Sequence, residues 1–429
     1  MARGAFVSFA RLSSLADAIA WIDREIASSL GAERVPLAEL SGRVLAQDLV
    51  AASDTPPFDR AVADGYAVSA QDTFGASVYS SLTFRLAEAS AADQATGLAI
   101  ATQVASGSPI PRGADAVVLP DHVQHDPGAA TVEIIEPAIA GANVDQRGDD
   151  FSRGTPLLRA GRRIRAVDVG LLGAAGIGFV EVVRRPRVRL VVTGADLYQA
   201  GRELRCGGVY DADTAMLRSL VERDGGITEI RRVEHRVSNA IREAIVGPAA
   251  DLVIVVGGSG VGAEDVPVLR ALKELRPGDD AGGLAIHGIA LRPGVSTGMG
   301  RVGSTPVFLL PGAPVSCLWA YELIASRGVR RLAGRCPELP YPSRDFMTVR
   351  KIVSSIGFVE VCAVRRMPDP DDVEPNTAAP PDRAGSLLAT AQADGFVLIP
   401  EASEGFPPGT RVRVYLYEDA NRCRDPNYL

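Results

Sequence analysis

The chain has 429 residues, of which 46% are hydrophobic and 23% are charged, so it can form several buried cores. Its formal net charge of −7 argues against a nucleic-acid partner or an anionic membrane surface. The sequence shows no secretory signal and no apolar run of transmembrane length, and its five cysteines form no CxxC pair. We therefore expect a cytoplasmic protein of about two to four domains with reduced thiols.

The first part of the chain has a helical pattern. Apolar side chains recur at helical spacing across residues 14–30, and a serine stands at the expected N-cap, either Ser13 or Ser14. A second helical pattern lies within residues 155–184 and is flanked by strand-like runs. We expect residues 8–55 and 151–185 to form one elongated helical linker domain.

Between these segments and after them the pattern changes twice. Residues 56–150 show short strand-like runs separated by glycine and proline turns, which predicts an inserted β-rich domain. In residues 186–335, continuous apolar strands alternate with helices, including helices near 213–223 and 239–246. Strands without polar alternation are typical of a sheet covered on both faces, so this part predicts a doubly wound, parallel α/β domain.

The last part of the chain follows a proline-rich linker at 336–345. Alternating apolar and polar residues after it predict a small antiparallel β domain over residues 340–418. Within that range, residues 367–385 have the composition of a loop. The expected fold class is thus a multidomain α/β protein.

A turn near the start of the β-rich region is a candidate site element. In the string TPPFDRAVADGYAV, residues 55–68, two prolines stiffen the entry and Asp64-Gly65-Tyr66 is expected to turn into a strand. Gly65 would be free to adopt a positive φ there. Taken alone, Asp64 could equally be an ordinary surface or capping residue.

The α/β region contains three strand–turn–helix junctions that are rich in small residues. They are VVTGAD (191–196), VVGGSGVGAED (255–265) and LLPGAPVS (309–316). In open α/β sheets, ligands bind outside the carboxyl ends of strands, where glycines let backbone amides approach a phosphate. Each junction alone could be a tight turn, but the three together indicate a phosphorylated ligand. None is a P-loop or a dinucleotide fingerprint.

These strings resemble, in order, those of the molybdopterin molybdenumtransferase family, which includes MoeA and the gephyrin E-domain. The first resembles PPFDNSAMDGYAV, GGSGVGAED resembles GGVSVGEAD, and LPGAPVS resembles LPGNPVS. GVYDAD (208–213) resembles IYDTN, SGSPIPRGADAVV (106–118) resembles TGAPVPEGADAVV, and NVDQRGDD (143–150) resembles NVRRRGED. The resemblance extends from about residue 8 to residue 416.

The resemblance implies a site with two groups of residues. Three carboxylates are expected to be catalytic and to hold Mg²⁺: Asp64, Asp150 and Asp265. The residues expected to bind the pterin nucleotide are Ser106, Gly107, Thr193, Gly194, Asp211, Gly257, Gly258, Gly262, Arg292, Pro293, Gly294, Pro311, Gly312, Pro314, Ser316 and Ser386. Asp265 has an alternative role as a helix cap.

The resemblance also implies a reaction and partners. The reaction would insert molybdate into adenylylated molybdopterin and release AMP, with Mg²⁺ offsetting the diphosphate charge. The protein would be a homodimer whose sites are completed by both chains. A molybdopterin adenylyltransferase and a client molybdoenzyme would be its other partners, with no nucleic acid and no membrane.

Several positions depart from the family strings, and most lie in the expected site. The family's KPGKP appears as RPGVS, so Val295 replaces a lysine, and Ala313 replaces an asparagine. Arg60 could restore the missing charge from another place. Three further substitutions are Ala61, Ala195 and Asp196. The family also has an acidic residue ahead of residue 239, for which only Glu234 could substitute here, and an arginine that is missing near residues 354–361.

Because of these departures, three functions remain open at the level of sequence. One is a working or variant molybdenumtransferase. The second is a non-catalytic relative that binds molybdopterin or the finished cofactor and delivers it to a client enzyme. The third is a structural partner protein, as the gephyrin E-domain is, although no peptide groove is visible in the sequence. The layout disfavours an amidohydrolase of the competence-damage type.

Overall fold

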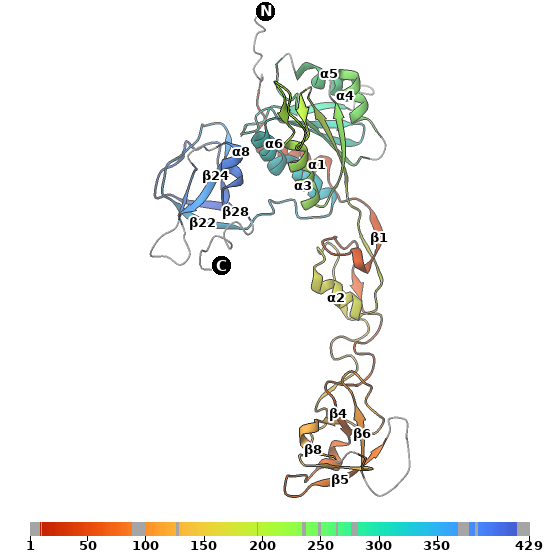
Figure 1. Ribbon diagram of the computed structural model, residues 1–429. Coiled ribbons are helices and arrows are strands. Elements are labelled where there is room, and N and C mark those ends of the chain that lie inside the picture. The colour runs from red at the N-terminus through yellow and green to blue at the C-terminus, as the bar shows by residue number, and fades with distance from the viewer. Residues whose placement is uncertain are drawn as a thin grey trace, which may run out of the picture. The chain divides into compact units, whose positions relative to one another are not determined.

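The structure is a computed structural model that describes residue 9 and residues 11–87, 99–125, 128–194, 196–233, 237–247, 250–262, 265–275, 282–367, 377–381 and 385–417. Its contacts divide the chain into two compact units (Figure 1). One unit comprises residues 34–182, and the other comprises residues 1–33 and 183–429. The predicted division into four domains stays a prediction.

The unit of residues 34–182 contains a small linker core and a β-rich part. The linker core gathers buried side chains such as Leu40, Leu172 and Val182 around α2 (Ala166–Ala174). Short strands frame it, and β11 (Pro156–Leu158) pairs with β2 (Leu49–Val50). The other elements of the linker are β1 (Ala32–Pro36), the 3-10 helix η1 (Leu37–Glu39) and β12 (Phe179–Val183).

The β-rich part is a six-stranded sheet in the order β7-β4-β6-β5-β9-β8. Its strands are β4 (Gly65–Val68), β5 (Leu82–Ala87), β6 (Ile100–Val104), β7 (Ala116–Val118), β8 (Val123–Gln124) and β9 (Thr131–Ile134). Beside it lie η2 (Ala70–Thr73), η3 (Pro120–His122) and the pair of β3 (Arg60–Ala61) with β10 (Val144–Asp145). This agrees with the β-rich pattern of the sequence.

Gly65 is required for a different reason from the one expected. It is absent from the described residues with positive φ. Instead, a Cβ atom at Gly65 would lie 2.3 Å from the carbonyl oxygen of Val118 on the neighbouring strand β7. Any side chain there would push β4 and β7 apart, so the glycine serves close strand packing rather than turn geometry.

The other unit begins with α1 (Leu15–Glu25), and a capping box explains its start. The backbone amide of Asp17 donates to the Ser14 hydroxyl at 3.0 Å, and the Asp17 carboxylate accepts from the Ser14 backbone. The choice between Ser13 and Ser14 is thereby resolved in favour of Ser14. The apolar face of α1, with Trp21 and Ile22, belongs to the core of the α/β sheet.

The α/β sheet has the order β16-β13-β17-β21-β20-β18. Four strands run parallel, namely β13 (Arg187–Thr193), β16 (Ile227–Val233), β17 (Leu252–Val256) and β21 (Thr305–Leu310). β18 (Gly282–His287) and β20 (Gly298–Val302) add an antiparallel edge, which the expectation of a parallel sheet did not include. The chain leaves β13 on one side to form β16 and returns on the other side to form β17, so the order switches there.

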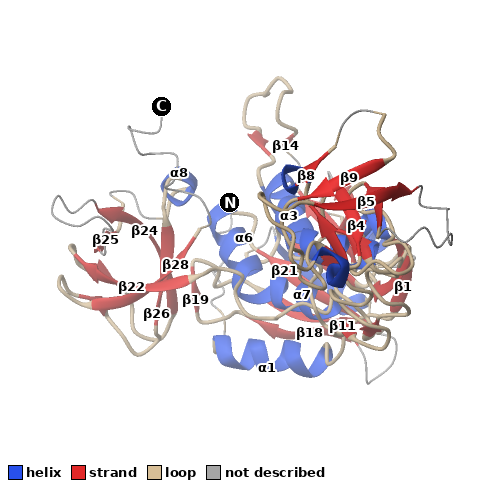
Figure 2. Ribbon diagram, turned by 90° about the horizontal axis from the view of Figure 1, so that it is seen from below, coloured by secondary structure: helices blue, strands red, loops and turns tan. Residues whose placement is uncertain are grey.

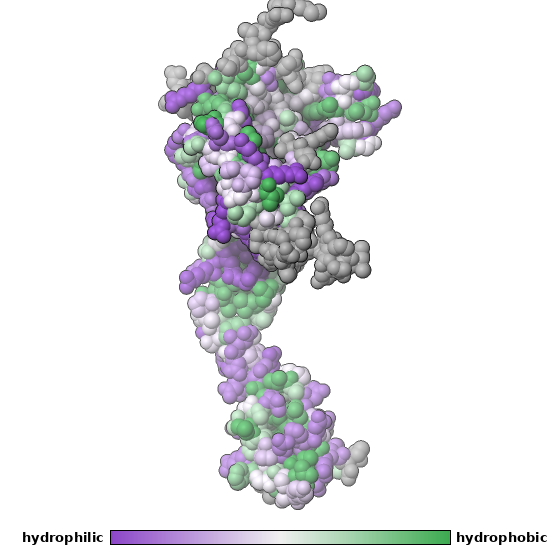
Figure 3. Space-filling model, turned by 90° about the vertical axis from the view of Figure 1, so that its left-hand side faces the viewer, coloured by the Kyte–Doolittle hydropathy of each residue, from purple (hydrophilic) through white to green (hydrophobic). Residues whose placement is uncertain are grey.

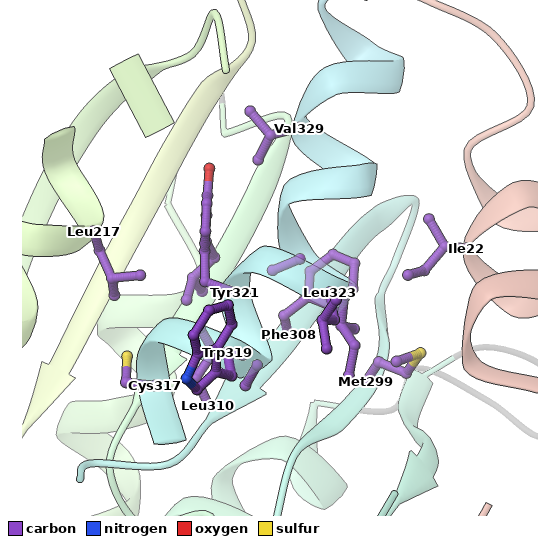
Figure 4. Close-up of a cluster of buried hydrophobic side chains, with 14 of the residues drawn as sticks. Ile22, Leu217, Met299, Phe308, Leu310, Cys317, Trp319, Tyr321, Leu323 and Val329 are labelled. Carbon is purple, nitrogen blue, oxygen red and sulfur yellow. The ribbon is translucent and has the colours of Figure 1, made fainter. Parts of the chain in front are cut away.

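Alternating side chains of the central strands face two separate cores, which confirms the doubly wound fold. Leu252, Ile254 and Val256 face a core shared with α1, α3 (Asp213–Arg223) and the helical segment of residues 314–332. Figure 4 shows this core around Trp319 and Phe308. Val253 and Val255 face a second core with α4 (Ser238–Ile245) and α5 (Val266–Glu274). The sheet is therefore buried on both faces.

After β21 the chain is helical over residues 314–332. It forms α6 (Pro314–Ala320), a π-helical turn (Tyr321–Ala325) and α7 (Ser326–Leu332). The C-terminal part is a six-stranded, mostly antiparallel sheet with α8 (Leu387–Ala391) beside it (Figure 2). Its strands are β19 (Leu291–Arg292), β22 (Ser343–Thr348), β24 (Val359–Met367), β25 (Thr377–Ala379), β26 (Gly395–Ile399) and β28 (Arg411–Leu416).

Two further short strand pairs belong to this unit. β23 (Ile352–Val353) pairs with β27 (Gly405–Phe406), and β14 (Leu197–Tyr198) pairs with β15 (Val209–Tyr210). The segment 367–385, expected to be a loop, contains strand β25, which pairs with β24 through partners such as Met367 and Thr377. Residues 368–376 and 382–384 of this segment lie outside the described residues.

On the face shown in Figure 3, hydrophilic and hydrophobic residues are interspersed. Among the described residues, no helix is long and apolar enough to span a membrane.

Candidate functional site

A cavity of about 770 Å³ opens at the carboxyl ends of β13, β17 and β21. Thr193 and Gly194 line it after β13, Gly257 and Gly258 after β17, and Gly312 after β21. This is the position where the strand order switches, and open α/β sheets bind their ligands at such points. The three small-residue junctions of the sequence therefore meet in one place.

Glycines are needed at the floor of this cavity. Gly257 and Gly258 have φ angles of +86° and +69°, which side chains rarely adopt. A Cβ atom at Gly258 would lie 2.3 Å from the Val268 side chain, and one at Gly312 would lie 3.3 Å from the Cα atom of Gly257. The turns after β17 and β21 thus touch each other, which leaves their backbones open toward the cavity.

Asp265 holds the turn that precedes α5. Its Oδ2 atom accepts a hydrogen bond from the Gly262 amide at 3.0 Å. A Cβ atom at Gly260 would lie 2.5 Å from the same oxygen, so the loop is closely folded around this carboxylate. Asp265 occupies the N-cap position of α5, but its side chain makes no capping hydrogen bond. Its carboxylate also lines the cavity.

Two serines from different loops meet at the cavity wall. The hydroxyl groups of Ser259 and Ser296 are 2.8 Å apart, and both residues line the cavity. The backbone oxygen of Ser259 also lies 2.8 Å from Nε2 of His287 on β18. These contacts fix the loop after β17 against the segment that follows β19.

The charge of the cavity lining is unusual for a site that should bind an anion. Its charged side chains are the carboxylates of Asp196, Asp213 and Asp265, and within the part of the chain that the structure describes no lysine, arginine or histidine lines it. Asp213, at the start of α3, is 8% exposed, and its Oδ1 atom has no hydrogen-bond partner in the described part of the chain. Burial, followed by the charge of Asp211, raises the pKa of Asp213 to about 7.

The expected ligand residues divide into those that line the cavity and those that do not. The lining residues are Thr193, Gly194, Gly257, Gly258, Pro311, Gly312 and Ser316, together with Asp265. The residues of the same unit that do not line it are Asp211, Gly262, Arg292, Pro293, Gly294, Pro314 and Ser386. Among those outside the lining, Asp211, Arg292 and Ser386 make contacts with other parts of the fold.

Asp211 and Ser386 stabilise local structure. The Asp211 carboxylate accepts from the backbone and hydroxyl groups of Thr214, at 3.0 and 2.6 Å, and from Arg232 at 3.0 Å. Burial raises the pKa of Asp211, but these hydrogen bonds outweigh it and hold the pKa below its ordinary value. The Ser386 hydroxyl caps α8 by accepting from the Ala389 amide at 3.1 Å.

Arg292, the cation that the resemblance places beside the ligand, is directed elsewhere. Its guanidinium lies 3.8 Å from the centre of the Phe358 ring and donates to the Ser355 hydroxyl at 2.9 Å. It therefore contacts the C-terminal sheet and not the cavity. Val295 is half-buried and does not line the cavity either, whereas its neighbour Ser296 does.

In the unit of residues 34–182, the three family-like strings converge. The Ser106 amide donates to Asp64 Oδ1 at 2.7 Å, and the Gly107 amide donates to the Ala61 carbonyl at 2.8 Å. The Asp150 amide donates to the Thr55 carbonyl at 3.1 Å. Asp64, Ser106, Gly107 and Asp150 are all exposed. The structure thus ties Asp64 to Ser106 as a preformed, solvent-accessible element.

Arg60 and Glu234 are the residues expected to replace charges that the family strings have at other positions. Arg60 forms an ion pair with Asp145 at 3.0 Å across the β3–β10 pair, so its charge is already compensated within its own unit. Ala195 and Glu234 lie outside the described residues. Among the described residues, no three histidine, cysteine, aspartate or glutamate side chains are grouped as a metal site requires.

Several lining residues were not identified as ligand residues from the sequence. They are Val192, Asp196, Leu197, Val209, Asp213, Val256, Ser259, Gly260, Ser296 and Ala313. Most of them lie within the three glycine-rich junctions, namely Val192, Asp196, Val256, Ser259, Gly260 and Ala313, so taking each whole junction as a candidate would have included them. Asp213 had its own signal, since it closes the GVYDAD string at the position where the family string ends on asparagine.

Comparisons with known proteins agree with this geometry. Residues 13–176 match the family described as the MoeA N-terminal region (domain I and II), and residues 190–331 match the probable molybdopterin binding domain. The latter range contains most of the cavity lining.

Similar proteins cover nearly the whole chain. It is 32% identical over 389 residues to molybdopterin molybdenumtransferase 2 of Mycobacterium tuberculosis strain H37Rv, covering 89% of this chain and 94% of that protein. The molybdopterin molybdenumtransferase of Staphylococcus aureus strain MSSA476 is 26% identical, with 91% and 92% covered. The crystal structure of the molybdopterin biosynthesis MoeA protein from Pyrococcus horikosii has 30% identity and a TM-score of 0.73, with 95% and 99% covered. The chain belongs to the molybdopterin molybdenumtransferase family.

Proposed function

We propose that the protein inserts molybdenum from molybdate into adenylylated molybdopterin and releases AMP, as part of molybdenum-cofactor assembly. The observation that carries this proposal is the cavity at the strand-order switch, where three small-residue turns end together. Its volume of about 770 Å³ is within the range of sites for small organic ligands. The similar proteins are named molybdopterin molybdenumtransferases, which supports molybdopterin as the class of substrate.

The residues of the cavity have separate roles in this proposal. The backbone amides of the turns around Gly257 and Gly312 face an anionic ligand and bind its phosphate oxygens. The hydroxyl groups of Ser259 and Ser296 supply further hydrogen bonds at the wall. Asp265 keeps the turn before α5 in place through Gly262, and it presents its carboxylate to the ligand.

A divalent cation fits the residues that are present. The charged lining consists of carboxylates, which are hard oxygen ligands of the kind that Mg²⁺ prefers. Asp265 would be the ligand from the cavity, with Asp64 and Asp150 as the proposed further carboxylates. When bound, Mg²⁺ would neutralise diphosphate charge. Because the described residues contain no preformed group of three such ligands, substrate oxygens and water would complete the coordination.

One observation favours a second function, that of a carrier that binds molybdopterin without turnover. No cation lines the described cavity, and Arg292 points to Phe358 instead. A transition state that develops negative charge gains most from nearby cations, so their absence would lower catalysis more than binding. Binding of adenylylated molybdopterin without AMP release would identify a carrier.

The direct experiment follows AMP release from adenylylated molybdopterin by the full-length protein, with Mg²⁺ and molybdate. We expect release in the wild type and its loss in Asp265→Ala. Glu274→Gln is the matched control, because Glu274 is an exposed carboxylate at the far end of the same helix α5. Tight binding without release in the wild type would replace the transferase with the carrier.

We further propose a cytoplasmic homodimer whose sites both chains complete, and which receives its substrate from a molybdopterin adenylyltransferase and passes its product to a client molybdoenzyme. Asp64 and Asp265 belong to different units of the chain, which is compatible with a site assembled from several parts. Sedimentation at micromolar concentration tests the dimer. A fully active monomer would contradict a shared site.

A further inference from the structure

One carboxyl group of the cavity is unlike the others. Asp213 is the first residue of α3, it is 8% exposed, and it lines the cavity. Its Oδ1 atom is buried and has no hydrogen-bond partner among the residues that the structure describes. A buried polar group without a partner is costly, so an incompletely paired carboxyl group on a residue that lines a cavity points to a partner on the ligand.

Among the described residues, the groups packed around Asp213 offer it no unpaired cation. On its own turn, Asp211 is held by Thr214, and Arg232 of β16 is paired with Asp211 at 3.0 Å. From α6 the titratable neighbour is the buried thiol of Cys317, whose pKa is raised by burial and then by the charge of Asp213.

The remaining elements packed against α3 contribute no charge at this end of the helix. At the end of β13 stands Thr193, whose hydroxyl donates to the Val256 carbonyl. The buried charges near α7, which include Glu322 and Arg330, gather around Arg223 and Asp224 at the opposite end of α3. Across the cavity, Asp196 and Asp265 are carboxylates.

We propose that Asp213 is a ligand-binding residue that acts as a neutral carboxylic acid and donates a hydrogen bond to an anionic, phosphate-type oxygen of the bound ligand. An ionised carboxylate at this position would repel such a ligand, and no cation of the lining would offset the repulsion. A protonated carboxyl group instead supplies one O–H donor. The family string ends here on asparagine, which is likewise neutral and carries a donor. This inference rests on the proposed function, because it assumes a ligand with a diphosphate group.

The inference gives ligand binding a distinct pH dependence. Burial and Asp211 already raise the pKa of Asp213 to about 7 in the free protein, and a hydrogen bond to an anionic oxygen raises it further. Binding should therefore weaken as pH rises through 7, by about tenfold between pH 6 and pH 8. A diphosphate diester, such as adenylylated molybdopterin, lacks the phosphomonoester ionisation near pH 6 that would otherwise obscure this change.

The test measures equilibrium binding of adenylylated molybdopterin, with molybdate omitted, between pH 6 and pH 8. The wild type should lose affinity as stated, whereas Asp213→Asn should bind with an affinity that does not change with pH. Glu222→Gln is the matched control, since Glu222 is an exposed carboxylate on the same helix, and it should keep the wild-type profile. Identical pH profiles in the wild type and Asp213→Asn would overturn the inference.

A second measurement needs only the wild type. Calorimetric binding at pH 7.5, repeated in buffers of different ionisation enthalpy, should show uptake of roughly three-quarters of a proton per ligand bound. Proton release, or no proton exchange, would overturn the inference even if Asp213→Asn failed to fold. Absence of binding by the wild type at every pH would overturn the proposed function itself, so the two failures are distinguishable.

Discussion

The two ends of helix α3 hold buried carboxylates in opposite circumstances. At the carboxyl end, Arg223 donates to both oxygens of Glu322, at 2.7 and 3.0 Å, and to Asp224 at 2.9 Å. Tyr321 and Tyr341 donate to these same carboxylates, at 3.0 and 2.6 Å. At the amino end, Asp213 has an orphaned oxygen and an anionic neighbour. The carboxylates at one end are paired with cations, and Asp213 at the other end is not.

This difference in pairing distinguishes Glu322 and Asp224, which have a structural role, from Asp213, for which we propose a role in ligand binding. The paired end joins α3 to the π-helical turn through Glu322 and to the segment before β22 through Tyr341, so its charges hold elements together. Burial, followed by the charge of Glu322, raises the pKa of Tyr341, whereas the charge of Arg223 lowers it. At the amino end, the orphaned oxygen of Asp213 joins no elements within the described residues, yet this residue lines the cavity. Buried polar groups that a fold leaves unsatisfied are typical of ligand sites.

The largest expected effect is at the paired end. Arg223→Met removes the cation that compensates Glu322 and Asp224, and breaking a buried ion pair on one side costs about 3–5 kcal/mol. The free energy of unfolding in urea, followed by tryptophan fluorescence, measures this loss, because both tryptophans lie in the adjoining core. A loss below about 1 kcal/mol would show that this end is not structural.

The next effect has the opposite sign and depends on pH. The folded state keeps Asp213 protonated up to about pH 7, whereas an unfolded aspartate loses its proton near pH 4. Stability is therefore lost as pH rises from 4 to 7, and the loss remains above pH 7. Asp213→Asn should increase the free energy of unfolding by on the order of 2 kcal/mol at pH 8 and change it little at pH 4.5. Equal effects at both pH values would contradict the account.

These two ends also show what the sequence could and could not predict. The bounds of α3 were predicted at 213–223, and the structure agrees, because apolar periodicity and glycine punctuation are local properties. The meeting of the three glycine-rich junctions followed from the rule for open α/β sheets. The isolation of Asp213 and the direction of Arg292 could not be predicted, since they depend on which residues from distant strands and loops lie beside them.

The antiparallel edge of the sheet and strand β25 were missed for a similar reason. β18 and β20 contain several glycines and small residues, so their strand pattern is weak, and they are specified by the pairing of β20 with β21 and of β18 with β20. β25 has three residues in a proline-rich region, and its identity comes from its partners β22 and β24. Tertiary pairing decided these elements where local propensity did not.

A smaller effect is expected at Asp265, whose carboxylate, unlike the charges at either end of α3, accepts a hydrogen bond from the Gly262 amide of its own turn. Asp265→Ala removes the acceptor for the Gly262 amide, so the free energy of unfolding should fall by about 1–2 kcal/mol while AMP release is lost. Urea unfolding and the AMP assay on one preparation measure both. Retained AMP release would remove Asp265 from the site.

The smallest effect is expected for a carboxylate that is neither buried nor near the cavity. Glu222 pairs with Arg218 on the exposed surface of α3, and its side chain is 47% exposed. Glu222→Gln should change the free energy of unfolding by less than about 0.5 kcal/mol, because exposed ion pairs on helices contribute little. A loss comparable to that of Arg223→Met would mean that burial does not distinguish the two pairs.

The most direct test of the central claim asks whether the cavity at the strand-order switch is the ligand site. Hydrogen–deuterium exchange of the full-length protein is measured with and without adenylylated molybdopterin and Mg²⁺, with molybdate omitted. The account predicts slower exchange of amides in the turns at 257–260 and 312–316 and at the start of α3, with unchanged exchange at the paired end around Glu322. Protection confined to other segments, with these turns unchanged, would contradict the account.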